Sequence, residues 1–328
     1  MVRQPPVAFE FHRYCRPFSP PLRTHYGSWH WREGIILRLT DGQGRQSFGE
    51  IAPIPWFGSE TLEQAIIWCQ QQTGMLTLDQ VMQIPPDLPA CQFGVESAWT
   101  GLDSSASANA TFFPRLSALL PAGEGALHCW RSHYQKGIQT FKWKIGVQDF
   151  GTEVRVFQAL IQHLPAGVCL RLDANGGLTL AQAVQWLEHC DRWGQVEYLE
   201  QPLPPTQLRI MQALSRDFAT PLALDESIAT VAQLQACYDQ GWQGLAVIKP
   251  AIAGFPSRLR QVCHDYGVDG ILSSVFETVV GRQSGLALAA EIMDPKRAVG
   301  FGTDHWFALT DPLQQTTAEA LWQQISVS

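Results

Sequence analysis

Apolar and polar residues alternate in two different ways along the chain, and the change falls near residue 105. Before it, short segments with a two-residue period are typical of antiparallel strands. Residues 34–40 and 46–51 form two such runs on either side of a short turn, which predicts a β-hairpin. Thr61 and Gln64 have the spacing of a capping box at the start of a helix. These patterns predict a small α+β domain.

After about residue 115, an apolar strand, a polar loop and an amphipathic helix follow each other repeatedly, at intervals of about 25 residues. We expect strands at 115–120, 140–145, 168–174, 196–201, 221–226, 244–249, 270–275 and 298–303. We expect helices between them, among others at 152–164, 180–190, 231–241 and 282–293. This repetition favours a parallel α/β barrel. An open, doubly wound sheet stays open as an alternative, although the sequence lacks its usual glycine-rich phosphate fingerprint.

The two patterns predict how the chain divides. Residues 1–104 are expected to form the α+β domain and residues 105–305 the barrel. The small residues at 104–110 are a linker candidate. Residues 306–328 are expected to be a tail that packs back on the first domain.

Polar residues stand at the ends of most predicted barrel strands. They are Lys142, Lys144, Asp173, Asn175, Glu200, Asp225, Lys249, Ser273 and Ser274. The carboxyl ends of parallel strands meet on one rim of a barrel, and barrel active sites are built there. We therefore expect these side chains to share one rim.

Three of these residues are carboxylates from adjacent strands, namely Asp173, Glu200 and Asp225. Three converging carboxylates repel one another unless a cation lies between them. An all-oxygen site that leaves room for water and substrate suits Mg²⁺, with Mn²⁺ as a substitute. The sequence therefore predicts a divalent metal site on the rim.

Lysine is rare, with five residues against 18 arginines. A lysine beside another cation can lose its proton near neutral pH and arginine cannot, so lysine is the better base. Alternation sends Lys142 and Lys144 to the same side of their strand, and Lys249 comes from beyond the carboxylates. Singly, each of these residues has a structural explanation, such as a helix cap or an exposed strand end. Together they predict a metal-bound carboxylate with a base on either face.

Five further residues lie near the predicted rim, and three of them have two interpretations each. Arg171 supports the metal ligands or forms an ion pair inside the barrel. Ser273 and Ser274 donate hydrogen bonds to a distal carboxylate of the substrate or pack as small residues. Glu277 is expected to be a partner of Lys249 rather than a base. Alternation is expected to point Glu226 away from the metal site.

Composition excludes other classes of function. The formal net charge is -7 and no basic run occurs, so a nucleic-acid partner is not expected and a small-molecule substrate is. Neither a signal peptide nor an apolar stretch of about 18 residues is found, which predicts a soluble cytoplasmic protein without a membrane partner. The eight cysteines lie at least 21 residues apart, so we expect reduced thiols and no zinc pair.

The rim motifs resemble those of the muconate-lactonizing subgroup of the enolase superfamily. The motifs are KxK at 142–144, DxN at 173–175, ExP at 200–202, DES at 225–227 and IKP at 248–250. This resemblance implies a modified TIM barrel, (β/α)₇β, behind an α+β capping domain. It also implies that Asp173, Glu200 and Asp225 bind Mg²⁺, and that Lys144 and Lys249 face each other across the substrate.

Within that subgroup, residues 16–39 and 49–65, together with LRLDAN and SSVFET, resemble the o-succinylbenzoate synthase family. The resemblance implies a lyase that dehydrates 2-succinyl-6-hydroxy-2,4-cyclohexadiene-1-carboxylate in menaquinone or phylloquinone biosynthesis. Lys144 would remove a proton, helped by Lys142, and Mg²⁺ would stabilise the resulting enediolate. Residues 20–27 would close over the site. Gly300 stands where the family has a glycine-rich strand end, and the register of its backbone donors stays open.

Two other functions remain as alternatives. The same two lysines would serve an N-acylamino acid racemase or a dipeptide epimerase, which needs both Lys144 and Lys249 as bases. A barrel kept as a binding scaffold would have no reason to retain a tight Mg²⁺ site. The sequence gives no indication of the oligomeric state.

Overall fold

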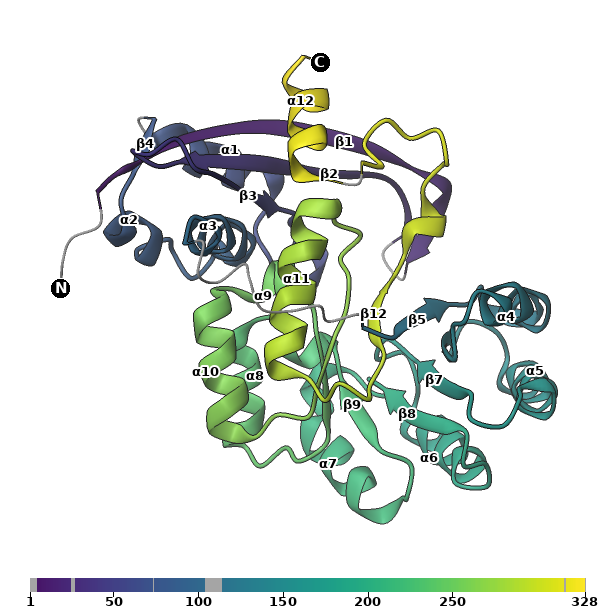
Figure 1. Ribbon diagram of the computed structural model, residues 1–328. Coiled ribbons are helices and arrows are strands. Elements are labelled where there is room, and N and C mark those ends of the chain that lie inside the picture. The colour runs from purple at the N-terminus through teal and green to yellow at the C-terminus, as the bar shows by residue number, and fades with distance from the viewer. Residues whose placement is uncertain (1–4, 25–26, 73, 104–113, 316, 328) are drawn as a thin grey trace.

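The computed structural model describes residues 5–24, 27–72, 74–103, 114–315 and 317–327. Within these residues the chain forms a four-stranded antiparallel sheet, in the order β3-β2-β1-β4, and an eight-stranded sheet. Figure 1 shows the antiparallel sheet at the top and the larger sheet with its helices below it. The linker predicted at residues 104–110 lies outside the described residues.

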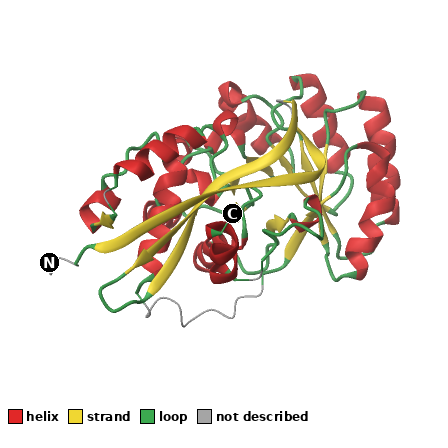
Figure 2. Cartoon of the chain, turned by 90° about the horizontal axis from the view of Figure 1, so that it is seen from above, coloured by secondary structure: helices red, strands yellow, loops and turns green. Residues whose placement is uncertain are grey.

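The capping domain is built on two long strands that cross the molecule (Figure 2). Its elements are β1 (Val7–Thr24), β2 (Gly27–Thr40), β3 (Gln46–Ile51), the 3₁₀ turn η1 (Pro55–Phe57), α1 (Leu62–Gln71), β4 (Met75–Leu76), α2 (Leu78–Met82) and α3 (Pro89–Gly101). The hairpin and the capping box at Thr61 and Gln64 are confirmed. Helix α3 packs on β3 so closely that a Cβ at Gly49 would collide with the Gly94 carbonyl.

The larger sheet is a parallel barrel. Its strands are β5 (Leu116–Leu119), β6 (Thr140–Lys144), β7 (Cys169–Asp173), β8 (Val196–Glu200), β9 (Leu222–Leu224), β10 (Leu245–Ile248), β11 (Gly270–Leu272) and β12 (Val299–Gly302). All its strand pairs are parallel, and β5 pairs with β12. A bridge between Ser273 and Gly300 joins the two outer strands of the sheet, β11 and β12. Each predicted barrel strand contains one observed strand, so the barrel is confirmed and the open sheet is excluded.

Helices connect successive barrel strands. They are α4 (Ala126–Gln135), α5 (Phe150–His163), α6 (Leu180–Cys190), α7 (Leu208–Asp217), α8 (Val231–Asp239), α9 (Pro250–Ala253) with α10 (Pro256–Tyr266), and α11 (Val279–Ile292). After β12 the described chain forms the 3₁₀ turn η5 (Asp304–Trp306) and then α12 (Ala318–Ser326). Helix α12 packs against β1 and shares an apolar cluster with Val280 at the start of α11. In the described residues, seven helical connections between eight parallel strands give the architecture (β/α)₇β.

The capping domain and the barrel share buried surface. The apolar cluster of the capping domain includes Ala251, Ile252 and Val275 from the barrel. Helix α12 contributes Trp322 to a cluster with Tyr14. The division at residues 104 and 305, with a separate tail, stays a prediction. In the described part of the chain, no helix is long and apolar enough to span a membrane.

A buried carboxylate fixes one contact between the two parts. Glu50 on β3 accepts hydrogen bonds from the backbone N–H groups of Thr278 and Gly281, each 2.9 Å away, at the start of α11. It also accepts a 2.6 Å bond from the Tyr14 hydroxyl. A negative charge at a helix N-terminus interacts favourably with the free N–H groups there. This contact therefore holds the capping sheet over the barrel rim.

Candidate active site

A pocket of about 230 Å³ lies between the carboxyl ends of the barrel strands and the capping domain. Among the predicted site residues, its wall contains Lys142, Lys144, Asp173, Asn175, Asp225, Lys249, Ser273, Ser274 and Gly300. The capping domain contributes Leu22, Thr24, Trp29, Ile54, Trp56 and Phe57. Glu200 is fully buried beside this wall, and Arg171 lies elsewhere. One rim thus brings together nearly all the residues that the strand ends predicted.

Three adjacent strands position the carboxylates. The register pairs Lys144 with Asp173 and Asp173 with Glu200, and Asp225 follows directly after β9. The Lys142 ammonium lies between two of them, 2.8 Å from Asp173 Oδ2 and 2.6 Å from Glu200 Oε1. Lys249 forms an ion pair with Asp225. The order Lys, Asp, Glu, Asp, Lys along the sequence is therefore the order around the rim.

The carboxylates carry more negative charge than their surroundings accommodate. Burial, and then repulsion from Asp173, hold the pKa of Glu200 well above its usual range, although Lys142 acts in the opposite direction. Burial also acts to raise the pKa of Asp173, but Lys142 holds that pKa below its ordinary value. Among the described residues, Glu200 Oε2 is buried without a hydrogen-bond partner. A buried carboxylate oxygen without a donor is costly unless a cation reaches it.

This donor set fits a hard divalent cation. Within the described residues, no three His, Cys, Asp or Glu side chains are arranged to hold a metal ion, and Lys142 and Lys249 pair with the carboxylates. Even so, the three groups are all oxygen donors from adjacent strands, and one oxygen of Glu200 has no hydrogen-bond partner in the part of the chain that the structure describes. Oxygen ligands beside open space are what Mg²⁺ requires. The residues therefore fit Mg²⁺.

Glu226 also faces the pocket, so the prediction that it points away from the metal site was wrong. Strand β9 ends at Leu224 and the chain enters a 3₁₀ turn at Glu226, so the alternation of a strand no longer applies. Its Oε1 accepts a 3.0 Å hydrogen bond from Asn175 Nδ2. Burial and repulsion from Asp225 raise the pKa of Glu226 to about 7. It adds a further carboxyl group to the edge of the site.

Gln201 was missed by sequence reasoning. It is fully buried and has a φ of 36°, an irregular conformation directly after Glu200. Its Oε1 accepts hydrogen bonds from the backbone N–H groups of Asp225 and Ser227, at 2.9 and 3.2 Å. Gln201 therefore orients the Asp225 backbone. The sequence signal was its place in Glu-Gln-Pro at a strand end, which marks a break in the strand.

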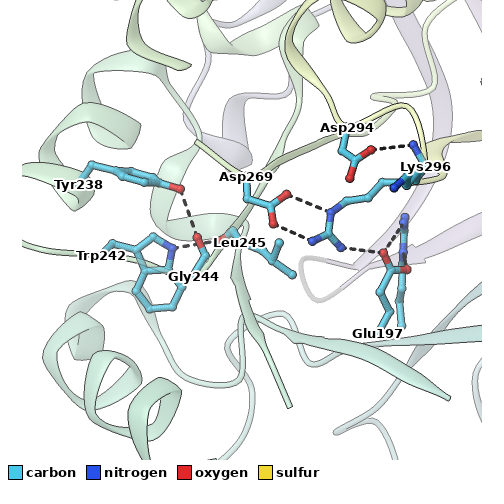
Figure 3. Close-up of polar contacts among 10 residues, drawn as sticks. Glu197, Tyr238, Trp242, Gly244, Leu245, Asp269, Asp294 and Lys296 are labelled. Carbon is cyan, nitrogen blue, oxygen red and sulfur yellow. Dashed lines mark hydrogen bonds and ion pairs between the residues drawn. The ribbon is translucent and has the colours of Figure 1, made fainter. Parts of the chain in front are cut away.

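The structure separates the two interpretations of Arg171. Its guanidinium is 2.8 Å from Glu197 Oε2 and donates to the Ala298 carbonyl, and its side chain does not line the pocket. Figure 3 shows Glu197 within a network of polar contacts. Only the interior ion pair agrees with this geometry.

The expected pairing of Glu277 with Lys249 was also wrong. Glu277 instead accepts hydrogen bonds from the Ser274 hydroxyl, at 2.9 Å, and from the Val275 backbone N–H, at 2.7 Å. Ser274 is thereby fixed at the pocket wall, and its Oγ also lies 3.3 Å from Thr303 Oγ1. Glu277 thus orders the wall formed by the loop after β11, while Lys249 pairs with Asp225.

Aromatic side chains cover the charged rim. Trp29 contacts Trp56 edge to face at 4.9 Å between ring centroids, and Phe276 at 5.7 Å. Leu22 and Thr24 come from the segment 20–27 that was expected to close over the site, and residues 25–26 of it lie outside the described part. An apolar cover over a charged floor excludes water and strengthens the electrostatic interactions beneath it.

Comparisons with known proteins agree with this architecture. Residues 127–319 match the family model "Enolase C-terminal domain-like", and residues 8–102 match "MenC, N-terminal domain". An o-succinylbenzoate synthase from Thermosynechococcus vestitus is 39% identical over 97% of this chain and 99% of its own. An o-succinylbenzoate synthase from Photorhabdus laumondii is 28% identical over 89% and 88%.

Solved structures extend the comparison. The o-succinylbenzoate synthase from Thermosynechococcus elongatus, which holds Mg in its active site, superposes with a TM-score of 0.85 over 97% of this chain and 99% of its own. A dipeptide epimerase from Methylococcus capsulatus has a TM-score of 0.78 over 92% and 91%, at 18% identity, and shares the fold. The chain therefore belongs to the o-succinylbenzoate synthase family of the enolase superfamily.

Proposed function

We propose that the pocket on the barrel rim carries out the reaction of this family, with Lys144 as the base. The chain is a Mg²⁺-dependent carbon–oxygen lyase that dehydrates 2-succinyl-6-hydroxy-2,4-cyclohexadiene-1-carboxylate to 2-succinylbenzoate, a step of menaquinone biosynthesis. The observation that carries the residue assignment is that Lys144 and Lys249 line one pocket on either side of the three carboxylates.

Asp173, Glu200 and Asp225 would hold the Mg²⁺ ion. When bound there, Mg²⁺ stabilises the negative charge that develops on the substrate carboxylate as the neighbouring carbon loses its proton. The unpartnered Oε2 of Glu200 supports this assignment among the described residues. Lys142 remains next to these ligands as a fixed positive charge that limits their mutual repulsion.

Lys144 is the better candidate for the base because its amino group is available. Lys142 is held by two carboxylates, whereas Lys144 forms no ion pair among the residues described. Lys144 would accept the proton from the carbon beside the carboxylate and then donate it to the departing hydroxyl group, which leaves as water. Lys249, on the opposite side, would place an ammonium group near the developing anion. The ring becomes aromatic, which drives the dehydration forward.

The remaining assignments concern the compartment in which the enzyme works and the residues that contact the rest of the substrate. We propose that the enzyme works in the cytoplasm, since all eight cysteines are described and none is in a disulfide. Ser273, Ser274, Asn175 and Gly300 would contact the rest of the substrate, because they line the same pocket. No nucleic-acid or membrane partner is proposed.

The test follows the ultraviolet absorbance of the substrate as the ring becomes aromatic. Purified enzyme with Mg²⁺ should convert it, EDTA should stop the conversion, and added Mg²⁺ should restore it. If a sample that binds Mg²⁺ converts none of the substrate, the lyase assignment fails. Racemisation of an N-acylamino acid, lost in both Lys144→Ala and Lys249→Ala, would then favour the epimerase alternative.

A further inference from the structure

A short loop of the capping domain places an aromatic ring over one of the two pocket lysines. Phe57, at the end of η1, lies with its ring centroid 3.8 Å from the Lys249 ammonium nitrogen. The same nitrogen forms the ion pair with Asp225. Lys249 is thus held between a carboxylate of the barrel and an aromatic face of the capping domain.

The loop that carries Phe57 is fixed from beneath. The Arg32 guanidinium is 1% exposed and donates to the carbonyl groups of Ala52 and Pro53, at 2.5 and 3.0 Å. At the other end, the Ile54 backbone N–H donates to Ser59 Oγ at 2.6 Å. A buried arginine that binds backbone carbonyl groups restricts the loop. Phe57 is therefore presented from a rigid position.

We propose that Phe57 is a positioning residue that keeps the Lys249 ammonium group over the pocket when Asp225 binds metal. The proposal rests on the function proposed above. If Asp225 binds a divalent cation, its negative charge is shared between the metal and Lys249, so the ion pair with Lys249 becomes weaker. The ring face of Phe57 then remains as the contact that holds the ammonium group, because the negative face of an aromatic ring attracts a cation.

A competing explanation is that Phe57 only fills apolar space. Two substitutions separate the explanations, because Phe57→Leu keeps an apolar side chain without a ring, and Phe57→Trp keeps a ring of stronger cation affinity. Trp56 is a matched control, since it belongs to the same loop and its ring contacts Trp29, whereas the ring over the Lys249 ammonium group is that of Phe57.

The placement is tested by NMR of protein in which lysine alone carries ¹³C. The chain has five lysines, so the ε-methylene signals form a small set, and Lys249→Arg identifies one of them by its loss. The Lys249 signal should lie upfield of the others because of the ring current of Phe57, and should stay there after Mg²⁺ is added. Phe57→Leu should return it to the common position, and Trp56→Leu should not. A Lys249 signal that is not shifted upfield, or that loses its shift with Mg²⁺, overturns the proposal.

The consequence for the reaction is tested by a double-mutant cycle. Phe57→Leu should lower kcat about tenfold with little change in KM, which is the scale of one desolvated cation–π contact, and Phe57→Trp should restore most of the loss. In a Lys249→Met background, Phe57→Leu should change nothing further. An equal loss in both backgrounds would mean that Phe57 acts without Lys249. If wild type shows no lyase activity, the proposed function fails, and the NMR result still decides where Lys249 lies.

Discussion

The two ends of the barrel strands use the same kinds of charged residue for different purposes. On β7, Arg171 and Asp173 are two residues apart. Arg171 belongs to the ion pairs toward the amino ends of the strands, and Asp173 belongs to the carboxylates at the rim. Toward the amino end, Glu197 accepts from Arg171 at 2.8 Å and from Arg297 at 3.0 Å, and Arg297 also pairs with Asp269 at 2.6 Å (Figure 3). At the rim, the carboxylates outnumber the lysines that pair with them.

The difference shows how stability and function divide along one strand. Where each buried charge has a partner of opposite sign, the cost of burying both charges is largely offset, and removing one partner is strongly destabilising. A surplus of one sign works against folding, and it persists where a ligand or substrate supplies the missing charge. Glu200, with a raised pKa and a buried oxygen without a partner among the described residues, belongs to the second kind.

The largest effect is expected from removing the base at the rim. Lys144→Ala should lower kcat by about 10³-fold, because a positioned general base contributes about 10²–10⁴-fold. Stability should change little, since Lys144 forms no ion pair within the described part of the chain. The measurement is initial rate by ultraviolet absorbance, together with thermal unfolding.

Lys296→Ala is the matched control for this change. Lys296 is an exposed lysine before β12 and lines a separate pocket beyond the strands' amino ends. It should retain wild-type kcat and KM. A Lys144→Ala enzyme that keeps more than about a tenth of wild-type activity would remove Lys144 from the role of base.

The next effect compares two glutamates on β8. Glu197→Gln should destabilise the protein by about 3–5 kcal/mol, because it leaves Arg171 buried without a carboxylate partner. Glu200→Gln should instead raise the Tm of the metal-free protein, because the buried charge that repels Asp173 is gone. Mg²⁺ should raise the Tm of wild type and of Glu197→Gln but not that of Glu200→Gln.

Thermal and chemical unfolding, each with and without Mg²⁺, measure these changes in Tm and in the free energy of unfolding. If both variants lose stability equally, the negative charges at the rim are balanced by positive ones as well as those at the amino ends of the strands. If Glu200→Gln still gains stability from Mg²⁺, Glu200 is not a ligand.

A smaller effect concerns pH. Burial and the nearby Glu50 raise the pKa of Glu277 from 4.5 to about 7, so between these values the folded state binds a proton that the unfolded state has lost. Stability therefore falls as pH rises from about 4.5 to 7, by about 2–3 kcal/mol from this group. Glu277→Gln should remove that part of the decline. Urea unfolding of both proteins at pH 5 and pH 8 measures it, and parallel declines would contradict the raised pKa.

The sequence was sufficient to predict the barrel and the rim. Strand spacing placed each of the eight barrel strands, because a parallel barrel repeats one unit with a buried strand. The order of Lys144, Asp173, Glu200, Asp225 and Lys249 around the pocket followed, since neighbouring strands in the sequence are neighbours in the sheet.

The remaining features depend on geometry that no local pattern contains. Glu226 reached the pocket because β9 ended at Leu224, before the expected end of that strand. Gln201 acquired its role from a positive φ beside a proline-containing loop. Phe57 meets Lys249 only because the capping domain docks on the rim, and the two residues are far apart in the sequence.

The smallest effect is expected from Asp269→Asn at the amino end. Asp269 has a side chain 48% exposed and pairs with Arg297, which keeps Glu197 as a second partner. An exposed ion pair contributes about 0–1 kcal/mol and is screened by salt, so the loss should be below about 1 kcal/mol and vanish near 1 M NaCl. The loss in Glu197→Gln should persist in the same salt, because Arg171 is buried. A salt-insensitive loss in Asp269→Asn would mean that the network acts as one unit, and that exposure does not separate its inner pair from its outer one.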